Sequence, residues 1–345
     1  MKKEYKINTL FFLIGIGIFT FLIIRFGIVN ILNEIAQIGV WFIPIIFIWM
    51  IIYSLNTIAW KIIIGNHLKV NFLQLVSLKI SSFALNYITP VIALGGEPWK
   101  VMNIKRLIGI ERASSSVILY DLMHILSHFF FWTFTLFIIF FTVKPTLATY
   151  IVLGVVLAFL ISIILIIYKW YKKGIVFSFI HFLNKIPLLK KVAAKLSKQE
   201  DTLEEIERQI VAFYNTRRKE FYLSLGMEFF ARIVGAIEFF LIMRAIQIDI
   251  NFFEAIYISA ATSLLTNLVG FVPLQLGTRE GSLYLVYESL KLAPAQGIVV
   301  SLATRVREFF FIFFGHAIIN NTAFTLFIKH HCCLHTPAPA KAPAY

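Results

Sequence analysis

The chain contains several uninterrupted apolar runs, and each is long enough to cross the hydrocarbon core of a bilayer. That core is about 30 Å thick, so a spanning helix needs about 20 predominantly apolar residues. Six runs predict full transmembrane helices, at residues 10–26, 40–60, 114–142, 147–168, 221–246 and 297–328. Runs of this length and number restrict the chain to very few architectures, all of them helical.

Composition supports lipid rather than water as the solvent. Hydrophobic residues make up 59% of the 345 positions and charged residues only 14%, which is too little polar surface for a soluble globular protein. The formal net charge is +14, but the basic residues cluster between the apolar runs, in the pattern of cytoplasmic loops. We therefore predict an all-α polytopic membrane protein whose partners are membrane lipids, with no nucleic acid.

Two further apolar stretches, at residues 71–107 and 251–290, are interrupted in the middle by proline and glycine. We interpret both as broken or re-entrant hairpins. If the first hairpin returns to its own face, the flanking cations, the N-terminal lysines and the tail from Lys329 share one side. This count predicts that both termini are cytoplasmic, in the cytoplasmic membrane of a bacterium.

The two interrupted stretches form a quasi-repeat. The first reads NYITPVIALGGEPWK and the second NLVGFVPLQLGTREGSL, with Leu-Gly between a proline and a glutamate seven residues later. The motif positions are Asn86, Pro90, Gly95 and Gly96 in the first copy and Asn267, Pro273, Gly277 and Gly281 in the second. An odd number of predicted crossings separates the copies, so they would be inverted, an arrangement typical of transporters. The alternative is that the glycines only allow close helix packing.

Ionisable residues within the predicted spans are a second feature, since each costs roughly 2.5–3.5 kcal/mol at a helix centre unless it is paired or solvated. The fifth span carries Glu228, Arg232 and Glu238, of which Glu228 and Arg232 are spaced for an i,i+4 pair. The last span carries Arg305, Arg307 and Glu308. These charges predict a polar cavity that holds a lipid head group. The predicted substrate-binding residues are Glu97, Lys100, Asp121, His124, Arg279, Glu280 and Arg305. For any single residue, the alternative is a structural pair or a snorkelling side chain.

The third span contains the sequence YDLMHILSH, which places Asp121, His124 and His128 on one helical face. Carboxylate and imidazole at this spacing can ligate a metal, but a hydrogen-bonded seam facing the same cavity is the favoured interpretation. The tail sequence HHCCLH is a poor metal site because its cysteines are adjacent. No Walker loop, nucleotide fingerprint or Ser/His/Asp motif is present. We therefore predict no metal site and no cofactor.

The longest polar segment, residues 169–220, carries twelve Lys or Arg against six Asp or Glu. Its apolar residues recur at three- and four-residue steps, which predicts one face of a helix or helical hairpin: Leu189, Val192, Leu196, Leu203, Ile206, Ile210 and Phe213. This face either lies on an anionic leaflet or packs on the helix bundle. We predict one transmembrane domain over residues 1–329 with this segment inserted, and a disordered Pro- and Ala-rich tail over residues 330–345.

Two motif pairs carry a resemblance to a known family. They are GGEPWK followed by GIERASSSVILYDLMH, and PLQLGTREGSLYLVYESL followed by SLATRVREFF. Over residues 10–328 the chain resembles the flippase-like membrane domain family, which includes the transmembrane part of lysylphosphatidylglycerol synthases and related single-domain proteins. Gly277, Arg279, Glu280, Gly281 and Arg305 stand where the family pattern would place them. Leu274 replaces a frequent glycine, and Asp121 stands where arginine is frequent.

The resemblance implies that the chain moves or binds a lipid as a flippase. Lysyl transfer from a charged tRNA is not expected, because the 345 residues contain no aminoacylating domain. Similar proteins are associated with hopanoid, glycolipid or isoprenoid-linked sugar pathways, so phospholipids and these lipids all remain open as substrates. Two other classes stay open: an intramembrane enzyme acting on a lipid-linked substrate, and a non-catalytic membrane subunit that recruits a soluble partner.

Overall fold

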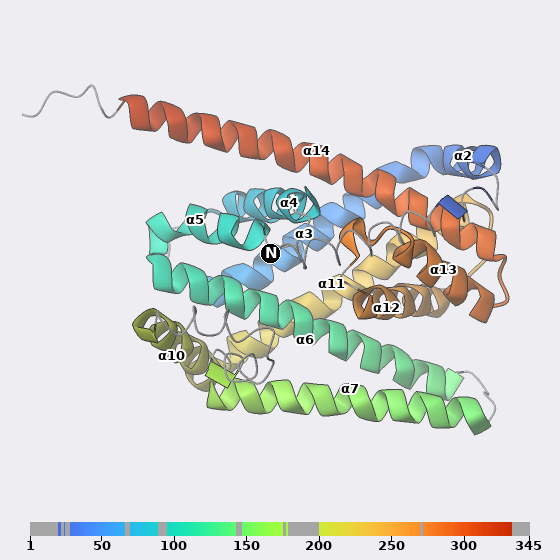
Figure 1. The fold of residues 1–345 in the computed structure, drawn as a ribbon, viewed down its shortest axis with the longest axis horizontal. Helices are drawn as coiled ribbons and strands as arrows, with labels where there is room; N and C mark the ends of the chain where they lie inside the picture. Colours follow the sequence, from blue (N-terminus) through green and yellow to red (C-terminus); the bar gives the residue numbers. More distant parts are fainter. Residues whose placement is uncertain are drawn as a thin grey trace, which may run out of the picture.

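The computed structural model describes residues 28–65, 70–88, 95–142, 147–174, 200–269 and 272–332, with the isolated residues 20, 21, 24, 177 and 178. All regular structure in these ranges is helical (Figure 1), which confirms the predicted all-α class. The helices are α2 (Ile28–Ile38), α3 (Phe42–Ile64), α4 (Phe72–Ile88), α5 (Gly96–Ile108), α6 (Ile110–Thr142), α7 (Leu147–Lys173), α10 (Glu200–Thr216), α11 (Arg218–Ala245), α12 (Phe252–Leu268), α13 (Thr278–Ser289) and α14 (Pro294–Cys332). Two 3₁₀ turns, η1 (Gly39–Trp41) and η3 (Pro273–Gln275), complete the described elements.

Five of the six predicted spans coincide with long helices: α3, α6, α7, α11 and α14. The span predicted at residues 10–26 lies outside the described residues, apart from three isolated positions. By length and hydropathy together, two stretches of the described chain qualify as membrane spans, Leu32–Ile64 and Ile110–Ile139. The apolar stretch within α7, Leu153–Ile166, is shorter. Helices α11 and α14 are longer than a bilayer requires, but their charged residues lower their hydropathy.

Both stretches predicted to be interrupted are indeed broken. Helix α4 ends at Ile88 and α5 begins at Gly96, while α12 ends at Leu268 and α13 begins at Thr278. The second break contains an unusual backbone, because Leu274 has φ 58°, Gln275 φ 52° and Gly277 φ 73°. Left-handed conformations are costly for residues that carry a Cβ, so neighbouring side chains have to hold this segment in place.

The two broken hairpins lie toward opposite ends of the molecule. In Figure 1, α4 and α5 lie at the end that also carries α10, whereas α12 and α13 lie toward the other end. Helices α3, α6, α7, α11 and α14 run between the two ends, with α11 packed along α3 and α14 packed on both α4 and α13. One hydrophobic core surrounds Trp60 and Tyr120, and a second surrounds Ile242 and Tyr287.

Helix α10 shows what part of the polar insertion does. Ile206, Ile210 and Phe213 are buried in the core around Trp60, as α10 packs on α6, α7 and α11. This half of the predicted apolar face therefore covers the helix bundle. The first half, Leu189 to Leu196, lies outside the described residues. At the other end of the chain, α14 reaches Cys332, so the first three residues of the predicted tail are helical.

Close packing of α14 on α4 depends on Gly315. A Cβ added there would lie 2.7 Å from the Cβ of Ala84 and 2.8 Å from the carbonyl oxygen of Ile80. We expect Gly315→Ala to lower stability by about 1–3 kcal/mol, because the overpacked side chain separates the two helices. Thermal unfolding of the purified protein in detergent would measure this loss.

The matched control is Gly226→Ala in α11, since a Cβ there would meet no atom within 4 Å. This variant should unfold at the temperature of the unmodified protein or slightly above it, because alanine favours helix over glycine. Equal losses in the two variants would show that Gly315 is not a packing contact.

Candidate functional site

A cavity of about 600 Å³ lies among the helices of both halves of the chain. Its wall is drawn from α3, α4, α5, α6, α11, α12, η3, α13 and α14. Five basic side chains reach it, Lys79, Lys100, Arg232, Arg279 and Arg307, together with five carboxylates, Glu97, Asp121, Glu228, Glu238 and Glu308. A protein interior accepts this density of charge only where most of the groups have partners.

The α5 end of the wall is organised by Lys100. Its ammonium pairs with the Glu97 carboxylate and lies 3.1 Å from Oδ1 of Asp121. With an exposed fraction of 2%, Lys100 faces the interior of the protein. Asn86 joins the two sides of the first break, since its amide nitrogen donates to Glu97 at 3.0 Å and its oxygen accepts from the Gly96 amide at 2.7 Å.

The α6 face forms a hydrogen-bonded seam with α11. Nδ1 of His124 lies 2.7 Å from the carboxylate of Glu228, and Arg232 donates to Oγ of Ser127 at 2.7 Å and to the His124 carbonyl at 2.8 Å. The predicted i,i+4 pair is therefore wrong, because Glu228 and Arg232 each bond to α6. Within the described part of the chain, no three His, Cys, Asp or Glu side chains are arranged to hold a metal ion.

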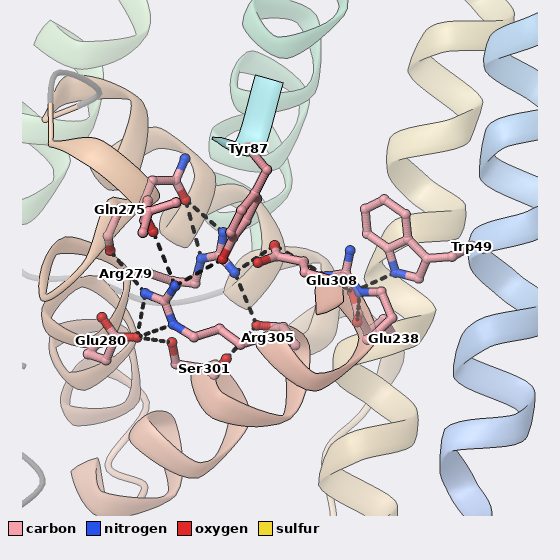
Figure 2. Close-up of polar contacts among 12 residues, drawn as sticks. Trp49, Tyr87, Glu238, Gln275, Arg279, Glu280, Ser301, Arg305 and Glu308 are labelled. Atoms are coloured by element: carbon pink, nitrogen blue, oxygen red, sulfur yellow. Dashed lines mark hydrogen bonds and ion pairs between the residues drawn. The ribbon is translucent and has the colours of Figure 1, made fainter. Parts of the chain in front are cut away.

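The opposite end of the wall carries a chain of ion pairs (Figure 2). Arg307 donates to both carboxylate oxygens of Glu238, at 3.0 and 3.2 Å, and its guanidinium lies 3.6 Å from the ring centroid of Trp49. Arg279 donates to Glu308 at 2.7 Å. Each of these two arginines pairs with a carboxylate on another helix, so the charges at this end of the wall neutralise each other.

Arg305 and Glu280 lie behind the wall and do not line the cavity. Oε1 of Glu280 accepts from Arg305 Nε at 2.9 Å and from Ser301 Oγ at 2.7 Å, and its other oxygen accepts from the Gly277 amide at 2.8 Å. Arg305 also donates to the carbonyls of Leu274 and Gln275, at 3.1 and 3.2 Å. Figure 2 shows this cluster around the second break. The pair, 0% and 6% exposed, holds the break.

The remaining motif positions have separate roles. Gly277 provides the positive φ before α13, Pro273 begins η3, and Asn267 donates to the Ser263 carbonyl at 2.7 Å. A Cβ at Gly281 would meet no atom within 4 Å, so packing does not require glycine there. Pro90 lies outside the described residues, whereas Gly95 immediately precedes α5.

Of the seven predicted binding residues, five line the cavity: Glu97, Lys100, Asp121, His124 and Arg279. Sequence reasoning missed Lys79 and Asn56, which also line it. The signal for Lys79 was present, since it is a lysine within the apolar helix α4 and obeys the rule that singled out the other intramembrane charges.

The profile of the family described as "Lysylphosphatidylglycerol synthase TM region" matches residues 9–315. The chain belongs to this family. The lysylphosphatidylglycerol synthase TM region spans every residue of the cavity wall, from Trp49 to Glu308. It also includes both breaks and the Glu280–Arg305 pair. Neither a curated protein nor a solved structure gives a match to the chain.

In this member of the lysylphosphatidylglycerol synthase TM-region family, Arg305→Ala removes one partner of a buried ion pair and frees two carbonyls of the strained break. We expect a loss of about 3–5 kcal/mol in unfolding free energy, because the Glu280 carboxylate stays buried without its counter-charge. The double variant Glu280→Gln/Arg305→Met should lose less unfolding free energy than Glu280→Gln and Arg305→Met lose in sum as single variants. Denaturant or thermal unfolding in detergent would measure both effects.

The matched control is Arg244→Ala, which breaks the pair that Arg244 forms with Asp249 at 3.0 Å. Both side chains are largely exposed, so about 0–1 kcal/mol is expected. If Arg305→Ala cost no more than Arg244→Ala, the structural role of the Glu280–Arg305 pair would be refuted.

Proposed function

We propose that this protein is a flippase that moves a polar-headed lipid between the two leaflets of a bilayer. The observation that carries the proposal is the charged cavity between the two halves of a chain that belongs to a lipid-associated membrane family. A lipid that crosses a bilayer has to bring its polar head group through hydrocarbon, which is costly without polar partners. The cavity offers cations and carboxylates at once, and therefore suits such a head group.

The arrangement of the breaks supports an inverted repeat. The outer ends of α4 and α5 lie at one end of the molecule and those of α12 and α13 at the other (Figure 1), while both hairpins contribute residues to the cavity. In transporters, interrupted helices from two inverted repeats surround the substrate site, and alternating access arises when one repeat moves against the other. Non-helical backbone is tolerated at membrane depth because protein or a water-filled cavity satisfies it.

The proposed topology has six full spans and two re-entrant hairpins, with both termini cytoplasmic, in the cytoplasmic membrane of a bacterium. Helix α10 and the outer ends of α4 and α5 then lie on the cytoplasmic side, where the basic residues of segment 169–220 meet an anionic leaflet. The hairpin of α12 and α13 enters from the opposite side. We propose a transporter without an enzymatic step of its own.

Filling the cavity should stop transport and leave the fold intact. Ser259 lines the cavity from α12, so Ser259→Phe places a ring in the path of the head group. In vesicles containing head-group-labelled phospholipid, the unmodified protein should expose inner-leaflet label to a membrane-impermeant quencher. We expect Ser259→Phe to lower the rate by an order of magnitude or more, since a blocked site loses the binding that pays for desolvation.

Ser162→Phe is the matched control, because Ser162 is an exposed residue of α7 outside the cavity wall. It should transport at the unmodified rate. A folded wild-type protein that matches empty vesicles for phospholipids, a glycolipid and an isoprenoid-linked lipid would rule out the flippase.

The inverted hairpins can be tested by cysteine labelling. In a protein whose Cys332 and Cys333 are replaced by serine, Arg106→Cys marks the end of α5 and Glu288→Cys the end of α13. Both positions are exposed. An impermeant maleimide should reach Glu288→Cys from outside intact cells, and Arg106→Cys only after the membrane is opened. Labelling of both positions from one side would refute the inverted arrangement.

A further inference from the structure

The five cations of the cavity wall differ in what neutralises them. Lys100, Arg279 and Arg307 each form an ion pair with a carboxylate of the wall. Among the described residues, neither Lys79 nor Arg232 has a carboxylate oxygen within the 4.0 Å that defines an ion pair. The carboxylates are already in use, since four of them pair with Lys100, Arg279 or Arg307 and the fifth contacts the imidazole of His124. Two positive charges therefore face the cavity without a direct anionic partner.

Lys79 is held by an aromatic ring rather than by an acid. Its Nζ lies 3.8 Å from the ring centroid of Tyr120, and Nζ of Lys100 lies 5.3 Å from the same centroid. A ring quadrupole attracts a cation but does not cancel its charge. The two ammonium groups around Tyr120 repel each other, and an anion bound beside Lys79 would relieve that repulsion.

Arg232 extends the same basic surface along α6. It bonds to the His124 carbonyl and to Ser127, which lie on α6 one to two turns beyond Tyr120. At 1.5 Å per residue, the points on α6 that the two cations contact lie roughly 6–10 Å apart along the helix. That spacing fits a phosphate at one cation with its head-group substituent reaching toward the other.

Buried polar atoms of the wall point to the same occupant. Within the described residues, the buried lining atoms without a hydrogen-bond partner include Oδ1 of Asn56, Nδ1 of His128, Oγ1 of Thr262, and one carboxylate oxygen each of Glu228 and Glu308. Polar atoms of a protein interior are nearly always satisfied. Hydroxyl or amine groups of a head group would satisfy atoms of this kind, whereas an acyl chain would not.

We propose that Lys79 and Arg232 form a subsite for a phospholipid head group, with the phosphate at Lys79 and the head-group substituent directed toward Arg232. The inference rests on the proposed function for the direction of lipid movement, but the binding it describes does not require transport. The pairs Arg279–Glu308 and Arg307–Glu238 leave no charge free for the ligand, so the phosphate enters at the α4, α6 and α11 side of the cavity.

The test measures binding alone. The purified full chain in detergent is titrated with phosphatidylglycerol and with diacylglycerol of the same acyl chains, and native mass spectrometry counts the bound lipid. We expect Lys79→Gln to weaken phosphatidylglycerol binding about ten-fold or more, the loss of one charge-assisted hydrogen bond, and to leave diacylglycerol binding unchanged. Lys79→Arg should retain the affinity. Lys105→Gln, which removes an exposed lysine of α5 outside the cavity, is the matched control and should bind like the unmodified chain.

Equal phosphatidylglycerol affinity in Lys79→Gln and the unmodified chain would overturn the subsite, as would an equal loss for diacylglycerol or no preference of the unmodified chain for phosphatidylglycerol. Added inorganic phosphate distinguishes the sources of the anion, because displacement of the lipid at millimolar phosphate shows that free phosphate also occupies the subsite. Binding that depends on Lys79 without transport in vesicles would remove the flippase and keep the subsite. Transport in vesicles together with lipid binding that does not depend on Lys79 would remove the subsite and keep the flippase.

Discussion

The contact between Arg305 and Glu280 is the constraint on which the second half of the structure depends. Between α12 and α13 the chain leaves the helix, and Leu274 and Gln275 adopt left-handed conformations that neither residue favours. Arg305 holds the carbonyls of both residues, while Glu280 holds the amide of Gly277 and the guanidinium of Arg305. Because one ion pair binds the backbone of the break and the first turn of α13, the position of α13 is fixed against α14. Arg279, the residue before Glu280, is thereby aimed at the cavity.

In the first half of the chain, a neutral side chain holds the corresponding break between α4 and α5. Asn86, at the end of α4, caps the Gly96 amide with its oxygen and donates to Glu97 with its nitrogen. An amide can do both because it carries a donor and an acceptor. The two copies of the motif therefore share the break, but the group that bridges the break comes from the preceding helix in one copy and from the following helices in the other. The sequence match between the two copies does not show this difference, because it does not say which side chain bonds across each break.

Much of the architecture could be predicted from sequence, because it depends on the length of the apolar runs and on where Pro and Gly interrupt them. Apolar runs place α3, α6, α7, α11 and α14, and Pro and Gly place the two breaks. The roles of individual charges could not be predicted in this way. Arg305 and Arg279 are both arginines near the second break, yet one lies behind the wall and the other lines it, because their orientation is set by helix packing. The partner of Glu228 could not be predicted for the same reason. His124, whose Nδ1 lies 2.7 Å from the Glu228 carboxylate, is on a different helix.

The cations of the cavity wall fall into two groups that differ in what they contact. On one side, Arg279 of α13 pairs with Glu308 of α14, and Arg307 of α14 pairs with Glu238 of α11 and is stacked on Trp49 of α3. Such pairs resist separation, because either charge alone would remain buried without a partner. On the side of α4, α6 and α11, Lys79 and Arg232 bond to an aromatic ring, a hydroxyl and a carbonyl, all of them neutral. A ligand anion gains most where it meets cations not already satisfied, since it does not have to displace a carboxylate. In the proposed subsite, the head group therefore binds at the unpaired cations.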